Sequence, residues 1–366
     1  MKNTFGTSLL TTIFGESHGP YIGAVMDGLA PGIEIDEEFM KHQLSLRRPA
    51  GKISTKRVEA DEYQIVSGAY QGKTTGTPLV IIIPNSAQHS ADYDATGRIA
   101  RPGHADYAAY CKYHGFEDYH GGGHFSGRIT AAVVAAGAIA MTALKKKGIL
   151  IGTHIESLGG IKDAAFMELE KDIVKLADEH FPVLDEAKGA EMTKLIEEIA
   201  ADGDSVGGVL ETAVIGMPSG VGEPFFDSVE SMLAHALFGI PGIKGVQFGA
   251  GFDMVNGRGS EFNDCFRSVD GRVVTKTNNN GGINGGITNG MPVVFRCAVK
   301  PTPSIYKEQD SVEIYSGTDA VLQVKGRHDP AIIHRARVVV DSMTALVIYD
   351  MLAQRFGTDY FAGKTE

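Results

Sequence analysis

The sequence predicts an α+β fold in which sheets and helices form layers within one domain spanning residues 1–366. The expected strands and helices follow one another in mixed order, rather than in the strict alternation of a doubly wound parallel sheet. No repeat of fixed period and no low-complexity linker divides the chain. A chain of 366 residues is also long enough to bury one large core.

Local patterns predict the first elements. A short β-branched run over residues 79–83 predicts a buried strand. The Ala-rich segment 130–147 ends in three lysines before Gly148, and both features are typical of a helix end. Amphipathic spacing predicts a helix over 163–180, and a second helix is expected over 186–201.

The second half of the chain is expected to add three strands and two helices. The strands are predicted at 206–217, 245–252 and 292–299, and the helices at 225–237 and 330–354. The last helix opens on a proline, which suits a first turn because its missing N–H has no partner there in any helix.

Composition and charge exclude several classes of protein. A hydrophobic fraction of 43% with 22% charged residues is typical of a globular protein. The net charge of −11 argues against a nucleic-acid binder held by bulk electrostatics. We find no apolar stretch long enough to span a bilayer and no signal-peptide pattern at the start. We therefore expect a cytoplasmic protein with neither a nucleic-acid nor a membrane partner.

Two histidines lie in glycine-containing turns. His18 follows Ser17 in a glycine-flanked loop, and His104 lies in a Pro-Gly turn between Arg101 and Asp106. Histidine titrates near neutral pH and can give or take a proton, and Asp106 could orient His104. Local structural roles remain open, namely a loop histidine in the first segment and an Arg101–Asp106 salt bridge in the second.

A run of three glycines precedes the helix expected from residue 130. Residues 121–123 are followed by Ser126 and Arg128. Exposed backbone N–H groups and the positive end of a helix dipole together favour an anion. The alternative is a flexible turn capped by Ser126. A basic patch containing Arg47 and Arg48 is either a solvated face or, in this acidic protein, an anion trap.

Irregular backbone is expected at two later places. The Asn- and Gly-rich segment 278–287 and the segment 300–304 could hold a phosphate or a flat polar ring through amides and Lys300. The alternative for the first segment is a long hairpin connection. Asp329 is expected to be the N-cap of the last helix, whereas Arg327 beside it has no such structural role.

Common motifs do not account for these segments. The P-loop-like segment 68–74 has three residues between its glycines instead of four, and no dinucleotide-binding glycine motif follows a strand. Histidines and an aspartate between residues 104 and 124 leave a metal-dependent phosphohydrolase open, although their spacing matches no common metal framework. A module that only carries a bound cofactor, without catalytic activity, is a further alternative.

Taken in order, these segments resemble chorismate synthase over essentially the whole chain. The segments that carry the resemblance are residues 14–19, 101–106, 120–128, 278–287, 300–304 and 327–330. The resemblance implies a β-α-β sandwich of antiparallel sheets and helices, assembled as a homotetramer. It implies a carbon–oxygen lyase of the shikimate pathway, which serves aromatic amino-acid biosynthesis. The reaction is the 1,4-anti elimination of phosphate from 5-enolpyruvylshikimate 3-phosphate to give chorismate.

The same resemblance implies reduced FMN as cofactor, although the reaction has no net redox change. It leaves open whether NADPH reduces the flavin on this protein or an external flavin reductase does so. The sequence contains no separate reductase domain, which favours external reduction.

The resemblance also implies roles for individual residues. His18 protonates the leaving phosphate, and His104 protonates or polarises the reduced flavin. Asp329, with Ser17 and Ser126, organises proton movement near flavin N5. No metal is implied.

The implied binding residues fall into two groups. The residues implied to bind substrate or NADP are Arg47, Arg48, Lys52, Arg101 and Arg128. The implied flavin contacts are His124, Phe125, Ser126, Pro241, Gly242, Gly285, Lys300, Pro301, Thr302, Pro303, Ser304 and Arg327. Pro241-Gly242 stands where the family usually has Asn-Ala, so a side-chain contact would be lost there. Lys52 is the nearest base where bacterial relatives often carry an arginine.

Overall fold

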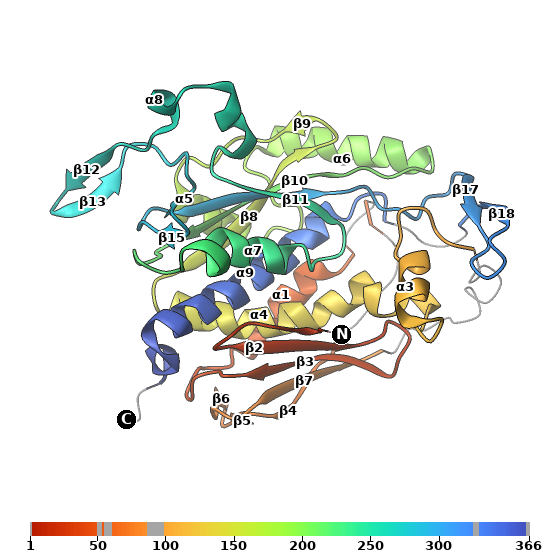
Figure 1. The fold of residues 1–366 in the computed structure, drawn as a ribbon, viewed down its shortest axis with the longest axis horizontal. Coiled ribbons are helices and arrows are strands. Elements are labelled where there is room, and N and C mark those ends of the chain that lie inside the picture. Colours follow the sequence, from red (N-terminus) through yellow and green to blue (C-terminus); the bar gives the residue numbers. More distant parts are fainter. Residues whose placement is uncertain (1, 50–52, 55–60, 86–98, 325–328, 364–366) are drawn as a thin grey trace.

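Two antiparallel sheets enclose a layer of helices in the computed structural model, which describes residues 2–49, 53–54, 61–85, 99–324 and 329–363 (Figure 1). Each sheet has five strands, and all neighbouring strands in both run antiparallel. In spatial order, the first sheet contains β1 (Thr4–Phe5), β2 (Leu10–Gly15), β3 (Tyr21–Asp27), β7 (Leu79–Pro84) and β4 (Gln64–Ser67). The second contains β11 (Ile243–Phe248), β16 (Val293–Val299), β10 (Gly208–Ile215), β8 (Leu150–Leu158) and β9 (Ile161–Lys162).

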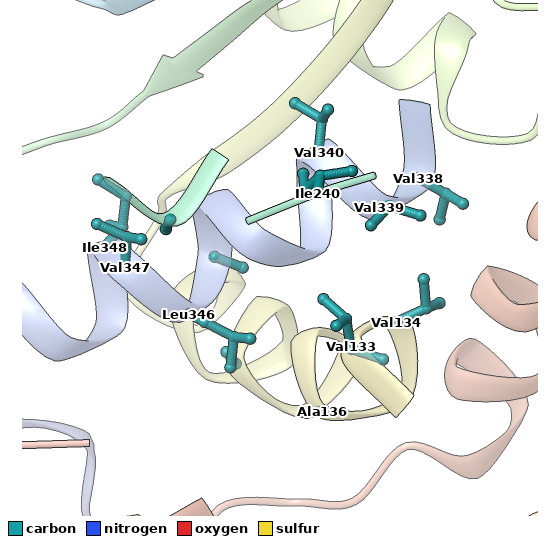
Figure 2. Packing of buried hydrophobic residues seen from close by; sticks show 14 of the residues in the cluster. Val133, Val134, Ala136, Ile240, Val338, Val339, Val340, Leu346, Val347 and Ile348 are labelled. Carbon is teal, nitrogen blue, oxygen red and sulfur yellow. The ribbon is translucent and has the colours of Figure 1, made fainter. Parts of the chain in front are cut away.

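The middle layer consists mainly of helices α4 (Thr130–Lys145) and α9 (Ile333–Phe356). Nearly every side chain of both helices is buried, because each contacts the other helix and one of the sheets. Figure 2 shows Val133 of α4 and Val339 of α9 in this core, together with Ile240 from the loop after α7. The β-α-β sandwich predicted from the sequence is confirmed.

Helices α4 and α9 approach each other closely at a glycine. A Cβ atom on Gly137 would lie 2.3 Å from Cβ and 2.6 Å from Cα of Ser342. Only a residue without a side chain fits at this distance. The rest of α4 consists largely of alanine and valine, so the two helices pack closely along the remainder of their contact.

The other helices border this sandwich. Helix α1 (Glu37–Arg47) packs against both central helices, and α7 (Val229–Leu237) packs against α9 and β11. Helix α5 (Leu169–Leu176) contacts β8 and β10, and α6 (Glu186–Ala201) contacts β9. Two further short helices in the described residues are α3 (Asp106–Tyr113) and α8 (Gly259–Phe262).

Among the described residues, four hairpins lie outside the two sheets, and each consists of two strands of two or four residues. They pair β5 (Ala69–Tyr70) with β6 (Lys73–Thr74), β12 (Phe266–Val269) with β13 (Arg272–Thr275), β14 (Ile283–Asn284) with β15 (Ile287–Thr288), and β17 (Gln309–Val312) with β18 (Asp319–Leu322). The β12–β13 hairpin projects from the body of the molecule, and the β17–β18 hairpin lies at the opposite end near α3 (Figure 1).

Three of the predicted helices begin later than the sequence indicated. The helix expected over 163–180 is confined to α5, because Asp163 accepts hydrogen bonds from the backbone of Leu184 and Asp185 instead of entering a helix. The last helix begins at Ile333, not at residue 330, and its start has no side-chain cap. The Pro330 carbonyl accepts a hydrogen bond from the Val206 amide at 2.8 Å, which ties this segment to the second sheet.

Asp329 is therefore not the N-cap that the sequence predicted, and it forms an ion pair with Arg335 instead. The helix expected over 225–237 is also interrupted. A 3-10 turn at Phe225–Asp227 precedes α7, whose N-cap is Ser228.

The expectation that no stretch could span a bilayer needs correction. Gly127–Lys145 is a helical stretch of 19 residues that is long and apolar enough by length and composition. However, 78% of the apolar 18-residue part of this stretch is buried inside the protein, because α4 is one of the two central helices of the sandwich. Its apolar composition is explained by this packing.

We predict that Gly137→Ala destabilises the fold by about 1–3 kcal/mol, because the new methyl group would force α4 away from the backbone of α9. Gly259→Ala is the control within α8, since its methyl group would come no closer than 3.9 Å to a neighbouring atom, Nδ2 of Asn263. The control should change the free energy of unfolding by less than about 1 kcal/mol. Denaturant titrations measure both, and equal stability of the two variants would contradict the close helix contact.

Candidate active site

A cleft of about 1080 Å³ lies where the first turns of α4 and α9 come together. Its walls also include the N-terminal strand, the loop after α7 and the segment 300–304. Residues from the predicted site that line it are Arg47, His104, His124, Phe125, Ser126, Pro241, Gly242, Lys300, Pro301, Thr302, Pro303, Ser304 and Asp329. Because two helix N-termini open here, their dipoles favour an anionic ligand.

The three-glycine turn contacts both predicted histidines. Gly121, Gly122 and Gly123 all have positive φ angles, at 59°, 85° and 52°. A Cβ atom on Gly121 would lie 2.2 Å from Cε1 of His18, and one on Gly122 would lie 3.1 Å from Cε1 of His104. The turn therefore lies in contact with both rings, and a side chain at either glycine would displace one of them.

Hydrogen bonds to the same turn orient His18. The Ser17 hydroxyl donates to the carbonyl oxygen of His120 at 3.0 Å, and it lies 3.1 Å from Nδ1 of His18. Since that hydroxyl proton is already donated, Ser17 Oγ accepts from Nδ1. The Ser17 amide also donates to the Gly123 carbonyl at 3.1 Å. Ser17 is buried, so the loop and the glycine turn hold the His18 ring from one side.

His104 is held by a carboxylate. Its Nδ1 lies 2.6 Å from Oδ1 of Asp106, and Arg101 donates from Nε and Nη2 to the same carboxylate at 2.8 and 2.7 Å. Burial alone would raise the pKa of Asp106, but hydrogen bonds from Arg101 and His104 outweigh it and hold this pKa well below its usual range. Asp106 is therefore ionised at neutral pH.

Lys300 connects three walls of the cleft. Its ammonium group donates to the carbonyl of Gly103, next to His104, and its amide donates to the carbonyl of Gly242 at 2.9 Å. Nδ1 of His124, which also lines the cleft, donates to the carbonyl of Gly15 at 2.7 Å. These bonds fix the mutual positions of segments that lie far apart in the sequence.

The predicted arginine group surrounds a buried acid. Asp61, whose side chain is fully buried, pairs with Arg47 at 3.0 Å and also with Arg128, while Arg48 lies 3.9 Å away. Burial would raise the pKa of Asp61, but the charges of Arg47 and Arg128 lower it. Of the three arginines, Arg47 lines the cleft. The sequence analysis missed Asp61, because no local pattern shows which acid a distant arginine meets.

Arg335 is a second residue that the sequence analysis missed. It lines the cleft from α9, pairs with Asp329 and donates from Nε to the carbonyl of Arg47 at 2.7 Å. The available signal was a basic residue shortly after Asp329, within a helix whose start already held predicted site residues. Arg335 thereby joins the start of α9 to the end of α1.

Other predicted residues lie beside or away from this cleft. His18, Ser17, Arg48, Arg101, Arg128 and Gly285 are not among the residues that line it. Gly285 lies in the β14–β15 hairpin, whereas Lys52 and Arg327 fall outside the described residues. Within the described part of the chain, no three His, Cys, Asp or Glu side chains could hold a metal ion together.

The fold and cleft define an enzyme-like site in which His104 lines a pocket suited to an anion and His18 lies behind the glycine turn beside it. Comparison with known proteins identifies the family of enzymes, because the model of the chorismate synthase family matches residues 9–353. The chain belongs to the chorismate synthase family.

Relatives support this assignment along the whole length. The chain is 43% identical to the chorismate synthase of Aeropyrum pernix over 356 residues, which is 97% of this chain and 93% of that protein. It is 45% identical to that of Parabacteroides distasonis over 352 residues, covering 96% and 97%. A crystal structure of chorismate synthase shares 28% identity with a TM-score of 0.76, covering 96% of this chain and 94% of that one.

We predict that Asp61→Asn lowers the free energy of unfolding by about 3–5 kcal/mol at pH 7, because two buried arginines lose their counter-charge. The folded-state pKa of Asp61 lies below its ordinary 3.8, so this stabilisation is present above that pH and is lost as pH falls through the folded value. The variant should therefore lose less stability than the wild type on acidification.

Arg48→Met is the control, because Arg48 is partly exposed and lies 3.9 Å from the carboxylate. It should cost less than about 1 kcal/mol. Denaturant unfolding of all three proteins at pH 7 and pH 3 measures these differences. A loss below 1 kcal/mol in Asp61→Asn would show that the acid does not stabilise the arginine group.

Proposed function

We propose that this chain eliminates phosphate from 5-enolpyruvylshikimate 3-phosphate to form chorismate, as a single-domain carbon–oxygen lyase that requires reduced FMN. The observation that carries the proposal is the placement of His18 and His104 against adjacent glycines of one turn, beside two helix N-termini. Such a site can bind an anion and supply protons to it. Full-length similarity to chorismate synthases supports the same reaction.

The residues present fit a flavin together with a small substrate. A cleft of about 1080 Å³ is at the upper end of ligand-site volumes, which are roughly 300–1,000 Å³. Apolar side chains of α4 and α9 form one wall and suit a flat ring; among them are Val133, Val339, Met343 and Leu346. The opposite rim contains polar groups from His124 to Ser126 and from Lys300 to Ser304, which would hold the polar edge and phosphate of FMN.

When bound, reduced FMN supplies electron density to the eliminating system and takes up the C6 hydrogen. The protein has the separate task of managing the leaving group. The elimination breaks one C–O bond, and phosphate departs with that electron pair and gains a proton. We assign this proton transfer to His18, whose ring is oriented by Ser17. The helix N-termini and Arg47 stabilise the negative charge that develops.

The remaining groups orient the ligands. His104 faces the polar edge proposed for the flavin, next to the Lys300 contact with Gly103. Asp329, paired with Arg335, and Ser126 both line the cleft, and we propose that they move a proton at its helical end. Fixed positions of this kind lower the entropic cost of reaching the reactive geometry.

Family membership also motivates the proposed context of the enzyme. We propose a cytoplasmic homotetramer of the shikimate pathway whose flavin is reduced by an external reductase. Oxidation of NADPH by the pure protein with FMN would instead assign the reduction to this chain.

The proposed function predicts phosphate release from 5-enolpyruvylshikimate 3-phosphate under anaerobic conditions with dithionite-reduced FMN, and none with oxidised FMN. His18→Ala and His104→Ala should each lose turnover by about 10²-fold or more while remaining folded. His114→Asn is the control, since His114 caps α3 in a left-handed conformation that asparagine adopts readily. Its turnover should equal that of the wild type.

Three results would argue against this function. Equal turnover with oxidised flavin would remove the need for reduced FMN. Phosphate release that requires a divalent metal and ignores flavin would identify a metal-dependent phosphohydrolase. Binding of FMN without phosphate release would identify a flavin carrier.

A further inference from the structure

We propose that Asp106 is a positioning residue that sets the orientation and tautomer of His104, with Arg101 locking the carboxylate in place. The inference rests on the proposed function, because it gives His104 its task in the cleft. It concerns two residues, Asp106 and Arg101, that do not line the cleft themselves. Both contact His104, which does line the cleft, and this contact is their link to the site.

The Asp106 carboxylate accepts hydrogen bonds on both oxygens from one short stretch of chain. Oδ1 lies 2.6 Å from Nδ1 of His104 and 2.7 Å from Nη2 of Arg101. Oδ2 accepts from the Arg101 amide at 2.9 Å and from Arg101 Nε at 2.8 Å. Four contacts fix both oxygens, so the carboxylate cannot turn away from the ring.

This contact determines which nitrogen of His104 carries the proton in the neutral ring. An ionised carboxylate accepts only, so Nδ1 must donate to it, and Nε2 is left as the nitrogen for exchange. The Cε1–Nε2 edge faces the glycine turn, since a Cβ on Gly122 would lie 3.1 Å from Cε1 and 3.3 Å from Nε2. His104 itself lines the cleft.

The same carboxylate balances the positive charge around the ring. Nη2 of Arg101 lies 3.1 Å from Nδ1 of His104, and Lys300 bonds to the neighbouring Gly103 carbonyl. The Asp106 carboxylate contacts both Nη2 of Arg101 and Nδ1 of the ring directly. Without the carboxylate, the two cations would disfavour the protonated ring.

A similar pair nearby lacks this connection to the cleft. His120 Nδ1 lies 2.6 Å from Asp118, the same distance as in the His104 pair. Neither residue lines the cleft, and the His120 ring stacks on Tyr119 at 4.3 Å. A short His–Asp contact alone therefore does not identify a positioning pair, whereas contact combined with exposure of the histidine to the cleft does.

The test replaces the carboxylate by its closest neutral analogue, Asp106→Asn. We expect kcat to fall about 10- to 100-fold, with KM for the substrate changed by less than about 3-fold, because His104 is misoriented while the binding groups remain. The limb of the pH–kcat profile that reports an essential protonated group should move to lower pH. Asp185→Asn is the matched control, since it removes the same charge at the start of α6. The control should keep the wild-type profile.

A double variant separates action through His104 from a general structural effect. In the His104→Ala background, Asp106→Asn should cause no further loss of kcat, because its only route to the reaction is gone. A further loss as large as in the wild-type background would overturn the proposal. A wild-type kcat and pH profile in Asp106→Asn would also overturn it.

Two further measurements keep the test decisive. If Asp106→Asn does not fold, Asp106→Glu replaces it. This variant keeps the charge but changes its position, so we expect a lowered kcat with an unmoved pH profile. A wild-type kcat in Asp106→Glu would overturn the proposal. ¹⁵N NMR of histidine-labelled protein should show His104 protonated on Nδ1 when neutral, and an Nε2-protonated ring would overturn it. This readout needs no turnover, so it tests the inference even if the wild type fails to release phosphate and the proposed function is wrong.

Discussion

The close contact between α4 and α9 is the constraint on which the site depends. At Gly137 and Ser342 the two helices pack too closely for any added side chain, and both sheets close over the pair. Their first turns consequently meet at one end of the molecule and form the cleft. Two buried helices with fixed spacing direct the positive ends of their dipoles toward the same cleft. This packing favours an anionic ligand there before any charged side chain contributes.

Charged side chains then refine the site through three acids, each paired with at least one arginine. Asp61 holds Arg47 and Arg128, Asp106 holds Arg101, and Asp329 holds Arg335. Burying such charges is unfavourable unless each is paired, so these contacts are weak evidence for stability but strong constraints on position. They hold arginines in and beside the cleft of a protein whose net charge is −11. They also divide the arginines by task, because Arg47 reaches the cleft while Arg128 and Arg101 stay beside it.

The sequence predicted those parts of the site whose signal is local. The three glycines at 121–123 have positive φ, which few other residues adopt, and their position before a buried helix was recognisable. The pairing of Arg128 with Asp61 was not, because 67 residues separate the two and only the folded chain brings them together. The same applies to the start of α9, which is delayed until Ile333 by a hydrogen bond to the second sheet.

Helices and strands, too, were predictable from the sequence where their signal is local. The Ala-rich helix and the strand at 79–83 have strong patterns of their own and were confirmed closely. Strands β2 and β3 were not predicted, since glycines and threonines dilute their apolar alternation and the sheet supplies their stability. The roles of Gly285 and of the residues outside the described ranges stay predictions from family resemblance.

The central claim is that the cleft between the helix N-termini holds flavin and substrate together. A crystal structure of the complex with oxidised FMN and 5-enolpyruvylshikimate 3-phosphate tests it most directly, because the oxidised cofactor is not expected to support turnover. The account predicts the flavin ring against the apolar wall of α4 and α9, with the substrate phosphate within hydrogen-bonding reach of His18. Ligands bound outside this cleft, or a phosphate held away from His18, would contradict it.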